Sequence, residues 1–225
     1  LREATVQLCT DVNANHVIQR CLQYLPKQAR QFVFEAAVEH CLAICRHKHG
    51  CCVMQRCFDA SDEQPPPPAH GGLSQRAVLM GKIVENAISL MQDPYGNYVV
   101  QYVLQRTTPV EAEQLVSQVL QSNMVFPLSK QKFSSNVMEK CLQLAPPRMR
   151  SALIDTLASD SCGIKELLHD NYGNYVVQRA LVAGSDNDAL ALARAIQPHL
   201  PSISGTSCAR RVITKILKRF PHFLS

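Results

Sequence analysis

The sequence predicts an all-α protein, an α-solenoid of about five helical repeats followed by a C-terminal half-repeat that acts as a cap. Three observations predict this fold. A short motif recurs along the whole chain, the apolar residues in each copy have helical spacing, and no run of alternating strands is present. The usual repeat length of 36 to 39 residues leaves room for two or three helices, as a solenoid unit requires.

The repeated motif is clearest in two ten-residue segments, Asp93–Tyr102 and Asp170–Arg179, which differ only at their second and last residues. We call the six residues that begin at Asn97 or Asn174 a frame. Four looser copies of the frame follow the same pattern: Asn15–Arg20, Cys51–Arg56, Ser135–Lys140 and a degenerate Arg210–Lys215. Six frames therefore run through the chain.

One interval between frames is longer than the others. Successive frames begin 36 to 39 residues apart, except that 46 residues separate Cys51 from Asn97. The excess coincides with a Pro- and Gly-rich stretch, so we expect a loop insertion at 60–73 rather than a domain boundary. A polyproline ligand at Pro65–Pro68 is the alternative interpretation. The predicted repeats are approximately 1–36, 37–80, 81–118, 119–157 and 158–197, with the cap at 198–225.

Each repeat has helical periodicity. Val99, Val100, Val103 and Leu104 form one apolar stripe of a helix. Further helices are expected at 110–120 and 149–157, beside Pro109 and Pro147, because proline is favoured in the first helical turn.

Composition excludes several classes of protein. The 225 residues are 46% hydrophobic and 18% charged, too apolar for a disordered tail, and no apolar run approaches the roughly 20 residues that span a membrane. We therefore expect a soluble protein. The formal charge of +5 is compatible with a polyanionic partner. The eight His are scattered, and no zinc-protease, phosphate-loop or nucleophile-elbow motif occurs, so no enzyme activity and no cofactor are expected.

The ten cysteines fit a reducing compartment better than a disulfide framework. Cys21, Cys57 and Cys141 occupy one repeated slot that Val103 and Ala180 fill elsewhere, which indicates a packing position. A second group of residues raises the alternative of a zinc site: Cys41, Cys45, His47, His49, Cys51 and Cys52. Their spacing lacks a second well-spaced pair of ligands, so we expect no metal.

The polar residues of the frames recur at fixed positions. The first and fifth residues lie on one face of a helix, about 6 Å apart, and we call them the edge pair. The edge pairs are Asn15 with Gln19, Cys51 with Gln55, Asn97 with Gln101, Ser135 with Glu139, and Asn174 with Gln178. The second residue of each frame is called the stacking residue: His16, Cys52, Tyr98, Asn136 and Tyr175.

These residue types suit single-stranded nucleic acid. Amide side chains both donate and accept, as a Watson–Crick edge requires, and planar groups can stack between bases. Basic residues follow four of the pairs and are candidate phosphate contacts: Arg20, Arg56, Lys140 and Arg179. The alternative is that these polar side chains only bond neighbouring repeats or loops.

The frames resemble the Pumilio-homology (PUF) family of RNA-binding repeat proteins. The resemblance rests on Tyr95-Gly-Asn-Tyr-Val-Val-Gln101, Tyr172-Gly-Asn-Tyr-Val-Val-Gln178, Asn15-His-Val-Ile-Gln19, Phe133-Ser-Ser-Asn-Val-Met-Glu139 and His49-Gly-Cys-Cys-Val-Met-Gln55. It covers nearly the whole chain and implies a right-handed solenoid in which each repeat binds one base, with the protein antiparallel to the RNA.

The family's correspondence between edge pair and base gives a sequence. It assigns uracil to Asn with Gln, guanine to Ser with Glu, and adenine to Cys or Ser with Gln. Taken from the C-terminal end, the five pairs imply 5′-UGUAU. The chemistry agrees at Glu139, whose carboxylate only accepts and so matches the two donors on guanine.

Two departures from the family pattern are present. Cys52 stands where an adenine-binding repeat usually has Arg, so weaker stacking is expected there. The first frame resembles the family's fourth repeat, so we expect further repeats upstream in a longer protein. The last frame has lost its edge pair and resembles the family's C-terminal cap.

The resemblance implies a cytoplasmic, monomeric repressor of translation and message stability. It would bind 3′ untranslated regions of mRNA and recruit deadenylation factors or other repressor proteins. Two alternatives remain open: a nucleolar Pumilio-like factor of ribosome assembly, and a protein-interaction scaffold of the armadillo or HEAT kind.

Overall fold

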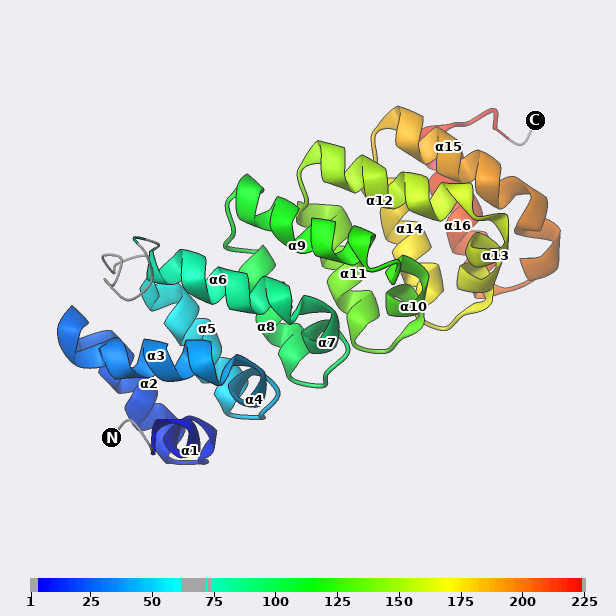
Figure 1. Cartoon of the computed structure of the whole chain (residues 1–225). Coiled ribbons are helices and arrows are strands. Elements are labelled where there is room, and N and C mark those ends of the chain that lie inside the picture. The colour runs from blue at the N-terminus through cyan, green and yellow to red at the C-terminus, as the bar shows by residue number, and fades with distance from the viewer. Residues whose placement is uncertain (1–3, 62–71, 73, 224–225) are drawn as a thin grey trace. The chain divides into compact units, whose positions relative to one another are not determined.

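The computed structural model describes residues 4–61, 72 and 74–223, and these residues form helices joined by short turns, without a β-strand among them. The chain divides into two compact units, residues 1–106 and 107–225. Each unit is described by itself below (Figure 1).

The first unit contains two rows of helices. Helices α2, α5 and α8 pack side by side in an inner row, and α3 and α6 form an outer row (Figure 1). A short helix precedes each inner helix and packs against it. The elements are α1 (Thr5–Thr10), α2 (Ala14–Tyr24), η1 (Lys27–Arg30), α3 (Gln31–Glu39), α4 (Cys41–Cys45), α5 (Gly50–Ser61), α6 (Gln75–Glu85), α7 (Ala87–Met91) and α8 (Gly96–Leu104).

The second unit repeats this arrangement. Helices α11, α14 and α16 form its inner row, α9, α12 and α15 its outer row, and α10 and α13 are the short helices. The elements are α9 (Pro109–Gln121), α10 (Val125–Lys130), α11 (Ser134–Leu144), α12 (Pro147–Ser159), α13 (Ser161–His169), α14 (Gly173–Ala183), α15 (Asp186–Ile196), η3 (Gln197–Ile203) and α16 (Ser207–Arg219).

The all-α, repeat-stacked fold predicted from the sequence is confirmed. Helices α9 and α12 begin at Pro109 and Pro147, and Thr108 closes a capping box with Glu111 at the start of α9. The Pro/Gly-rich insertion predicted at 60–73 falls between α5 and α6. Most of that insertion, 62–71 and 73, lies outside the described residues.

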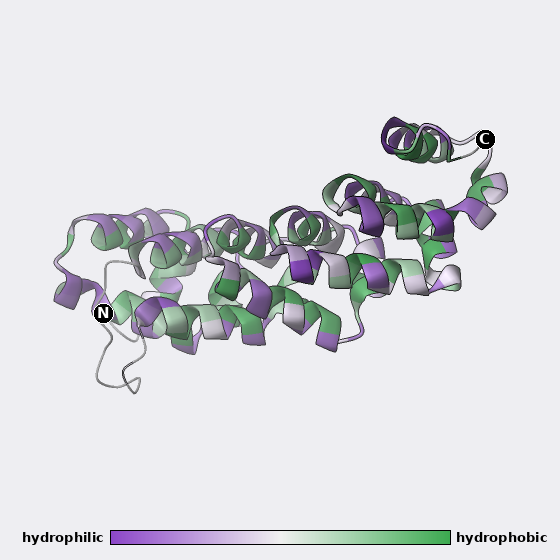
Figure 2. Ribbon diagram, turned by 90° about the horizontal axis from the view of Figure 1, so that it is seen from above, coloured by the Kyte–Doolittle hydropathy of each residue, from purple (hydrophilic) through white to green (hydrophobic). Residues whose placement is uncertain are grey.

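The core consists of the apolar stripes of both rows (Figure 2). Val99, Val100 and Val103 are at most 1% exposed, as their spacing predicts. The repeated cysteine slot is a packing position, since Cys57 and Cys141 are buried, while Cys21 on α2 is half-buried. Within the described part of the chain, no helix has the length and apolar character needed to cross a bilayer.

Arginines bind the carbonyl ends of inner helices in the second unit. Arg150 of α12 donates to the carbonyls of Ala145 at 2.9 Å and Ala183 at 3.1 Å, where α11 and α14 end. Arg219, the last residue of α16, donates to Leu181 and Gly184 at 2.9 and 2.8 Å. The carbonyls at a helix C-terminus lack partners within the helix, and a guanidinium satisfies several of them at once.

Candidate nucleic-acid interface

The start of each inner helix that carries an edge pair is fixed by a side chain four residues before that pair. The Oδ1 atoms of Asp11, Asp93 and Asp170 each accept two backbone N–H groups at 2.7–2.8 Å. Gln131 does the same through Oε1 at 2.8 Å, and His47 accepts one N–H through Nδ1 at 3.2 Å. Each cap satisfies amides that the helix leaves without partners, so every edge pair enters its helix at the same point.

The inner helices also begin in close contact with the short helices before them. A Cβ added at Gly50 would lie 2.3 Å from the carbonyl oxygen of Ile44, and one at Gly96 would lie 2.9 Å from that of Leu90. At the matching place in α11, Ser134 Oγ donates to the carbonyl of Leu128 at 2.6 Å. In α5, α8 and α11 the position therefore holds either no side chain or one that bonds the facing carbonyl, whereas α2 has Ala14 there.

Three edge pairs share one hydrogen-bonded arrangement. In each, the Asn Nδ2 donates to two backbone carbonyls at 2.7–3.1 Å, three and four residues earlier. The Gln Nε2 then donates to the Asn Oδ1 at 2.9–3.0 Å. Both Asn donors are used inside the protein, so a ligand meets one Gln Nε2 hydrogen and the Gln Oε1. The pairs are Asn15 with Gln19, Asn97 with Gln101, and Asn174 with Gln178.

The other two edge pairs differ in what they offer. Cys51 Sγ and Ser135 Oγ each donate to a backbone carbonyl at 3.4 Å, those of Lys48 and Lys132. Burial raises the pKa of the Cys51 thiol to about 12, so it stays neutral at physiological pH. Gln55 keeps the donor and acceptor of a carboxamide, whereas ionised Glu139 has acceptors only.

In four of the five edge pairs, the second member is less buried than the first. The first residue is at most 9% exposed in every frame: Asn15, Cys51, Asn97, Ser135 and Asn174. The fifth residue is half-buried in four frames and buried at Gln178. In those four frames the fifth residue is therefore the main polar contact available to a ligand.

All five stacking residues are exposed, as their predicted role requires. Tyr98 is 58% and Tyr175 45% exposed, which is unusual for aromatic side chains on packed helices. The Tyr175 hydroxyl accepts a hydrogen bond from Arg211 at 3.1 Å, and Asn136 donates to the carbonyl of Lys132 at 3.1 Å.

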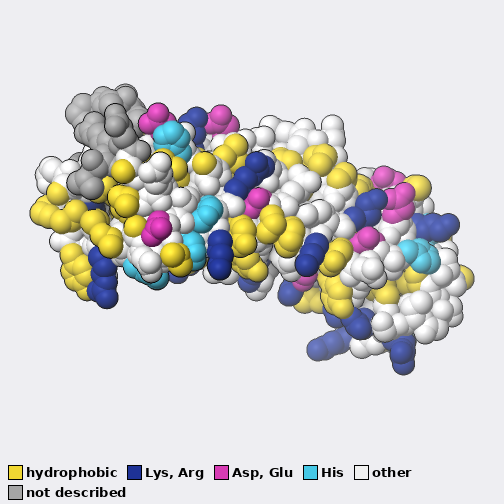
Figure 3. Space-filling model, turned by 90° about the horizontal axis from the view of Figure 1, so that it is seen from below, with side chains coloured by type: hydrophobic (Ala, Val, Ile, Leu, Met, Phe, Trp, Pro, Cys, Tyr) yellow, Lys and Arg dark blue, Asp and Glu magenta, His cyan; other side chains and the backbone are white. Residues whose placement is uncertain are grey.

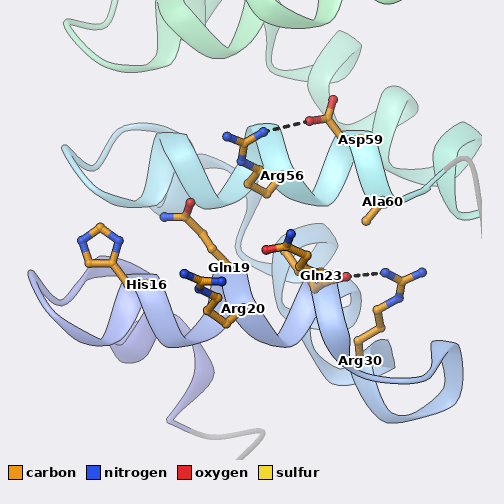
Figure 4. Close-up of a pocket in the computed structure, with 9 residues that line it drawn as sticks. His16, Gln19, Arg20, Gln23, Arg30, Arg56, Asp59 and Ala60 are labelled. Atoms are coloured by element: carbon orange, nitrogen blue, oxygen red, sulfur yellow. Dashed lines mark hydrogen bonds and ion pairs between the residues drawn. The ribbon is translucent and has the colours of Figure 1, made fainter.

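A pocket of about 740 Å³ opens between α2 and α5. His16, Gln19 and Arg20 extend from α2, and Arg56 extends from α5 across the same opening (Figure 4). This volume lies in the range of small-molecule binding sites. In the first unit, a stacking residue, an edge residue and two cations thus line one cavity.

The predicted phosphate contacts have partners of different kinds. Arg20 donates to the Tyr24 hydroxyl at 3.0 Å, Arg56 pairs with Asp59 of its own helix at 3.4 Å, and Arg179 pairs with Glu139 at 3.3 Å. The sixth residue of the frame, which is basic in these copies, is Tyr102 in the third frame, and the Tyr102 hydroxyl donates to Asp59 at 2.6 Å. On the face shown in Figure 3, Lys and Arg side chains occur among hydrophobic, acidic, histidine and uncharged ones.

The cysteine- and histidine-rich segment between α4 and α5 is packed rather than gathered around a centre. Cys41 Sγ lies 3.9 Å from Cys45 Sγ in α4, and both side chains are buried. Among residues 4–61, 72 and 74–223, no three His, Cys, Asp or Glu side chains are grouped as metal ligands.

Sequence reasoning missed the caps and the burial of the first edge residue. The caps had a visible signal, because Asp11, Asp93 and Asp170 all stand four residues before an edge Asn. The burial had none, because the repeated Asn is equally compatible with a surface position. The carbonyls that bind its amide come from the turn before the helix.

Comparison with known proteins places these features in a family. The model of the Pumilio-family RNA-binding repeat matches residues 5–36, 40–64, 86–120, 125–158 and 164–196. A Pumilio domain-containing protein of Schizosaccharomyces pombe is 42% identical over 221 residues, which is 98% of this chain and 30% of that protein. Pumilio homolog 12 of Arabidopsis thaliana is 38% identical over 216 residues, 96% of this chain and 34% of that protein. The chain thus spans about a third of these relatives.

Solved structures are similar over nearly the whole chain. The Puf4 RNA-binding domain bound to a recognition sequence from the 3′ UTR of HO endonuclease RNA superposes with a TM-score of 0.81 at 35% identity, covering 96% of this chain and 65% of that one. The RNA-binding domain of yeast Puf5p bound to SMX2 RNA gives a TM-score of 0.78 at 29% identity, covering 98% and 65%.

Proposed function

Because this chain belongs to the Pumilio family of RNA-binding repeat proteins, we propose that it binds single-stranded RNA containing 5′-UGUAU, with one base to each of five repeats. Asn174 with Gln178 binds the first uracil, and Ser135 with Glu139 binds guanine. The third to fifth bases contact the remaining pairs: Asn97 with Gln101, Cys51 with Gln55, and Asn15 with Gln19.

The observation that carries this proposal is the hydrogen-bonded arrangement shared by three edge pairs. Its Gln offers one Nε2 hydrogen and a free Oε1, and uracil presents the complementary acceptor and N3–H donor. Gln55 keeps a whole carboxamide, which complements the N6 donor and N1 acceptor of adenine. The four Gln pairs thus offer one donor and one acceptor, and the Glu139 pair differs from them in offering acceptors only.

Guanine is the base with the sharpest requirement. Its Watson–Crick edge presents two donors, and the Glu139 carboxylate accepts both. Adenine or uracil at this place would oppose one acceptor to another. We therefore expect the second repeat from the C-terminal end to discriminate most strongly.

Stacking and phosphate contacts supply affinity without sequence preference. Tyr98, Tyr175 and His16 are exposed beside edge pairs, and stacking of one base on an aromatic ring contributes about 1–3 kcal/mol. Arg20 and Arg56 flank the same opening between α2 and α5, and we expect them to contact the phosphate backbone.

In the whole protein, this module would act on mRNA. Several similar structures are of RNA-binding domains bound to 3′ UTR sequences. We propose that this protein likewise binds 3′ untranslated regions in the cytoplasm, has no catalytic chemistry of its own, and represses translation or message stability through recruited deadenylation factors or other repressor proteins.

The test is a change of base preference. Fluorescence anisotropy would compare 5′-UGUAUAUA with 5′-UUUAUAUA at a fixed salt of about 150 mM, because phosphate contacts make affinity depend on salt. The double variant Ser135→Asn, Glu139→Gln converts the guanine pair into a uracil pair. Wild type should favour the first RNA by about tenfold or more, the difference expected from one bidentate base contact, and the variant should favour the second.

The control keeps the edge pairs and changes a region remote from them. Arg148→Gln lies on the outer helix α12, where the side chain is 81% exposed, and it should bind both RNAs as wild type does. Equal binding of the two RNAs by wild type would contradict base-by-base recognition and favour a nucleolar assembly factor or a protein scaffold.

A further inference from the structure

One of the five edge pairs has a charged partner from the next repeat. The Nε of Arg179 on α14 lies 3.3 Å from Oε2 of Glu139 on α11, and these two inner helices pack side by side. The two side chains are 39% and 27% exposed, so the ion pair is partly shielded from water.

The sixth residue of the frame has a different partner where the fifth residue of the preceding frame is neutral. Arg56 stands one repeat after Gln19, as Arg179 stands one repeat after Glu139. Arg56 pairs with Asp59 of its own helix at 3.4 Å instead. Arg179 has Val182 where Arg56 has Asp59, and its carboxylate partner is the edge residue of the preceding repeat.

A glutamate needs to be held in place in order to bind guanine well. Its flexible side chain loses rotamer freedom when it is fixed, and that loss reduces affinity. A guanidinium that already holds one carboxylate oxygen limits the rotation before RNA arrives. One oxygen of a carboxylate can accept more than one hydrogen bond, so Oε2 can keep Arg179 and still accept from the base.

The ion pair also leaves the negative charge of Glu139 next to the positive charge of Arg179 when RNA covers the carboxylate. A stacked base displaces water from Glu139, and a charge that loses water without a partner is costly. The two terminal nitrogens of the Arg179 guanidinium remain for phosphate, because the contact with Glu139 uses Nε.

We propose that Arg179 is a positioning residue for guanine: it orients the Glu139 carboxylate from the neighbouring repeat and so sets the preference for guanine over other bases. This inference rests on the proposed function. It assigns a specificity role to a residue outside the edge pair and the stacking position.

The experiment measures base preference in a double-mutant cycle. Affinities for 5′-UGUAUAUA and 5′-UAUAUAUA, which have the same length and charge, are determined for wild type, Arg179→Gln, Glu139→Gln and the double variant. Arg179→Gln should lower the preference for guanine about five- to tenfold, as expected for a close charge pair. In the Glu139→Gln background, the same change should alter the preference less than twofold.

Two further variants separate positioning from a phosphate contact. Arg56→Gln occupies the matching slot without touching an edge residue, so it should weaken binding of both RNAs equally and leave their ratio unchanged. Arg179→Lys keeps the charge and should restore part of the guanine preference. Thermal unfolding of each variant checks that the fold is intact.

The outcomes are distinct. Suppose that wild type prefers guanine. If Arg179→Gln then keeps or raises that preference, or lowers it as much in the Glu139→Gln background as in wild type, the positioning role is wrong and the proposed function stands. If wild type binds both RNAs equally, both proposals fail.

Discussion

Gln101 donates from Nε2 to Oδ1 of Asn97 at 2.9 Å, while the amide nitrogen of Asn97 donates to the carbonyls of Asp93 and Pro94 at 2.8 and 3.0 Å. Asn97 is 2% exposed. Its amide is therefore part of the folded structure, and it orients the Gln that faces solvent. An edge pair acts as a support and a contact rather than as two equal contacts.

Asn97→Asp tests this division of roles. The substitution places a carboxylate oxygen against two carbonyl oxygens, so the free energy of unfolding should fall by about 2 kcal/mol, the cost of an unsatisfied buried polar group. Urea unfolding measures it. Asn136→Asp, at an exposed position, is the control and should change stability by less than about 0.5 kcal/mol. Equal losses in both variants would contradict the supporting role of Asn97.

Cys52 offers a direct probe of stacking. It is exposed at the stacking position, whereas burial raises the pKa of Cys141 to about 12 and keeps that thiol unreactive. Iodoacetamide should label Cys52 quickly in the free protein and at least about fivefold more slowly with saturating 5′-UGUAUAUA, because a stacked base covers the thiol. Mass spectrometry of peptides gives both rates. Cys162 is exposed outside any frame, and RNA should not protect it.

Two glycines should respond in opposite directions to alanine. At Gly50 a new Cβ would meet the backbone carbonyl of Ile44, so Gly50→Ala should lower the free energy of unfolding by about 2 kcal/mol or more. At Gly81, within α6, nothing lies within 4 Å of the new Cβ, and Gly81→Ala should raise it by about 0.5–1 kcal/mol. Chemical denaturation of both variants measures the difference in sign.

Asp11 should make stability depend on acid. Hydrogen bonds from the backbone N–H groups of Ala14 and then Asn13 lower the pKa of its carboxyl from the ordinary value of 3.8. Its stabilising contribution is therefore complete above about pH 4 and is lost as pH falls through the lower pKa of the folded state. The difference in unfolding free energy between wild type and Asp11→Ala should shrink from pH 6 to pH 3.

The matched control for this prediction is Asp11→Asn, which keeps an acceptor oxygen but does not titrate. Its stability relative to Asp11→Ala should stay constant over the same pH range. A wild-type advantage over Asp11→Ala that is equally large at pH 3 would show that the cap acts without its charge.

The sequence predicted the fold well because repetition and periodicity are local properties. Val99, Val100 and Val103 are buried as their spacing requires, and α9 and α12 begin at the two prolines. The contact of Arg179 with Glu139 could not be predicted in this way. It joins residues 40 positions apart and depends on how α11 and α14 pack.

The candidate site shows the same limit. Frame spacing predicted the edge pairs and the stacking residues, and of the latter Tyr98 and Tyr175 are exposed. It did not distinguish buried Asn97 from half-buried Gln101, because both lie on one stripe of the helix. That distinction comes from backbone carbonyls in the preceding turn, which a residue pattern does not display.

The arginine contacts at the ends of α11 and α14 have a thermodynamic consequence. Arg150 holds the last turns of two successive inner helices, and Arg219 holds the second of them again from α16. When one repeat frays, its neighbour loses the group that satisfies its terminal carbonyls. Nearest-neighbour coupling of this kind favours all-or-none melting in a linear array. Residues 107–225 should therefore unfold in a single transition, with the end of α14 as the joint through which the loss of one repeat reaches the next.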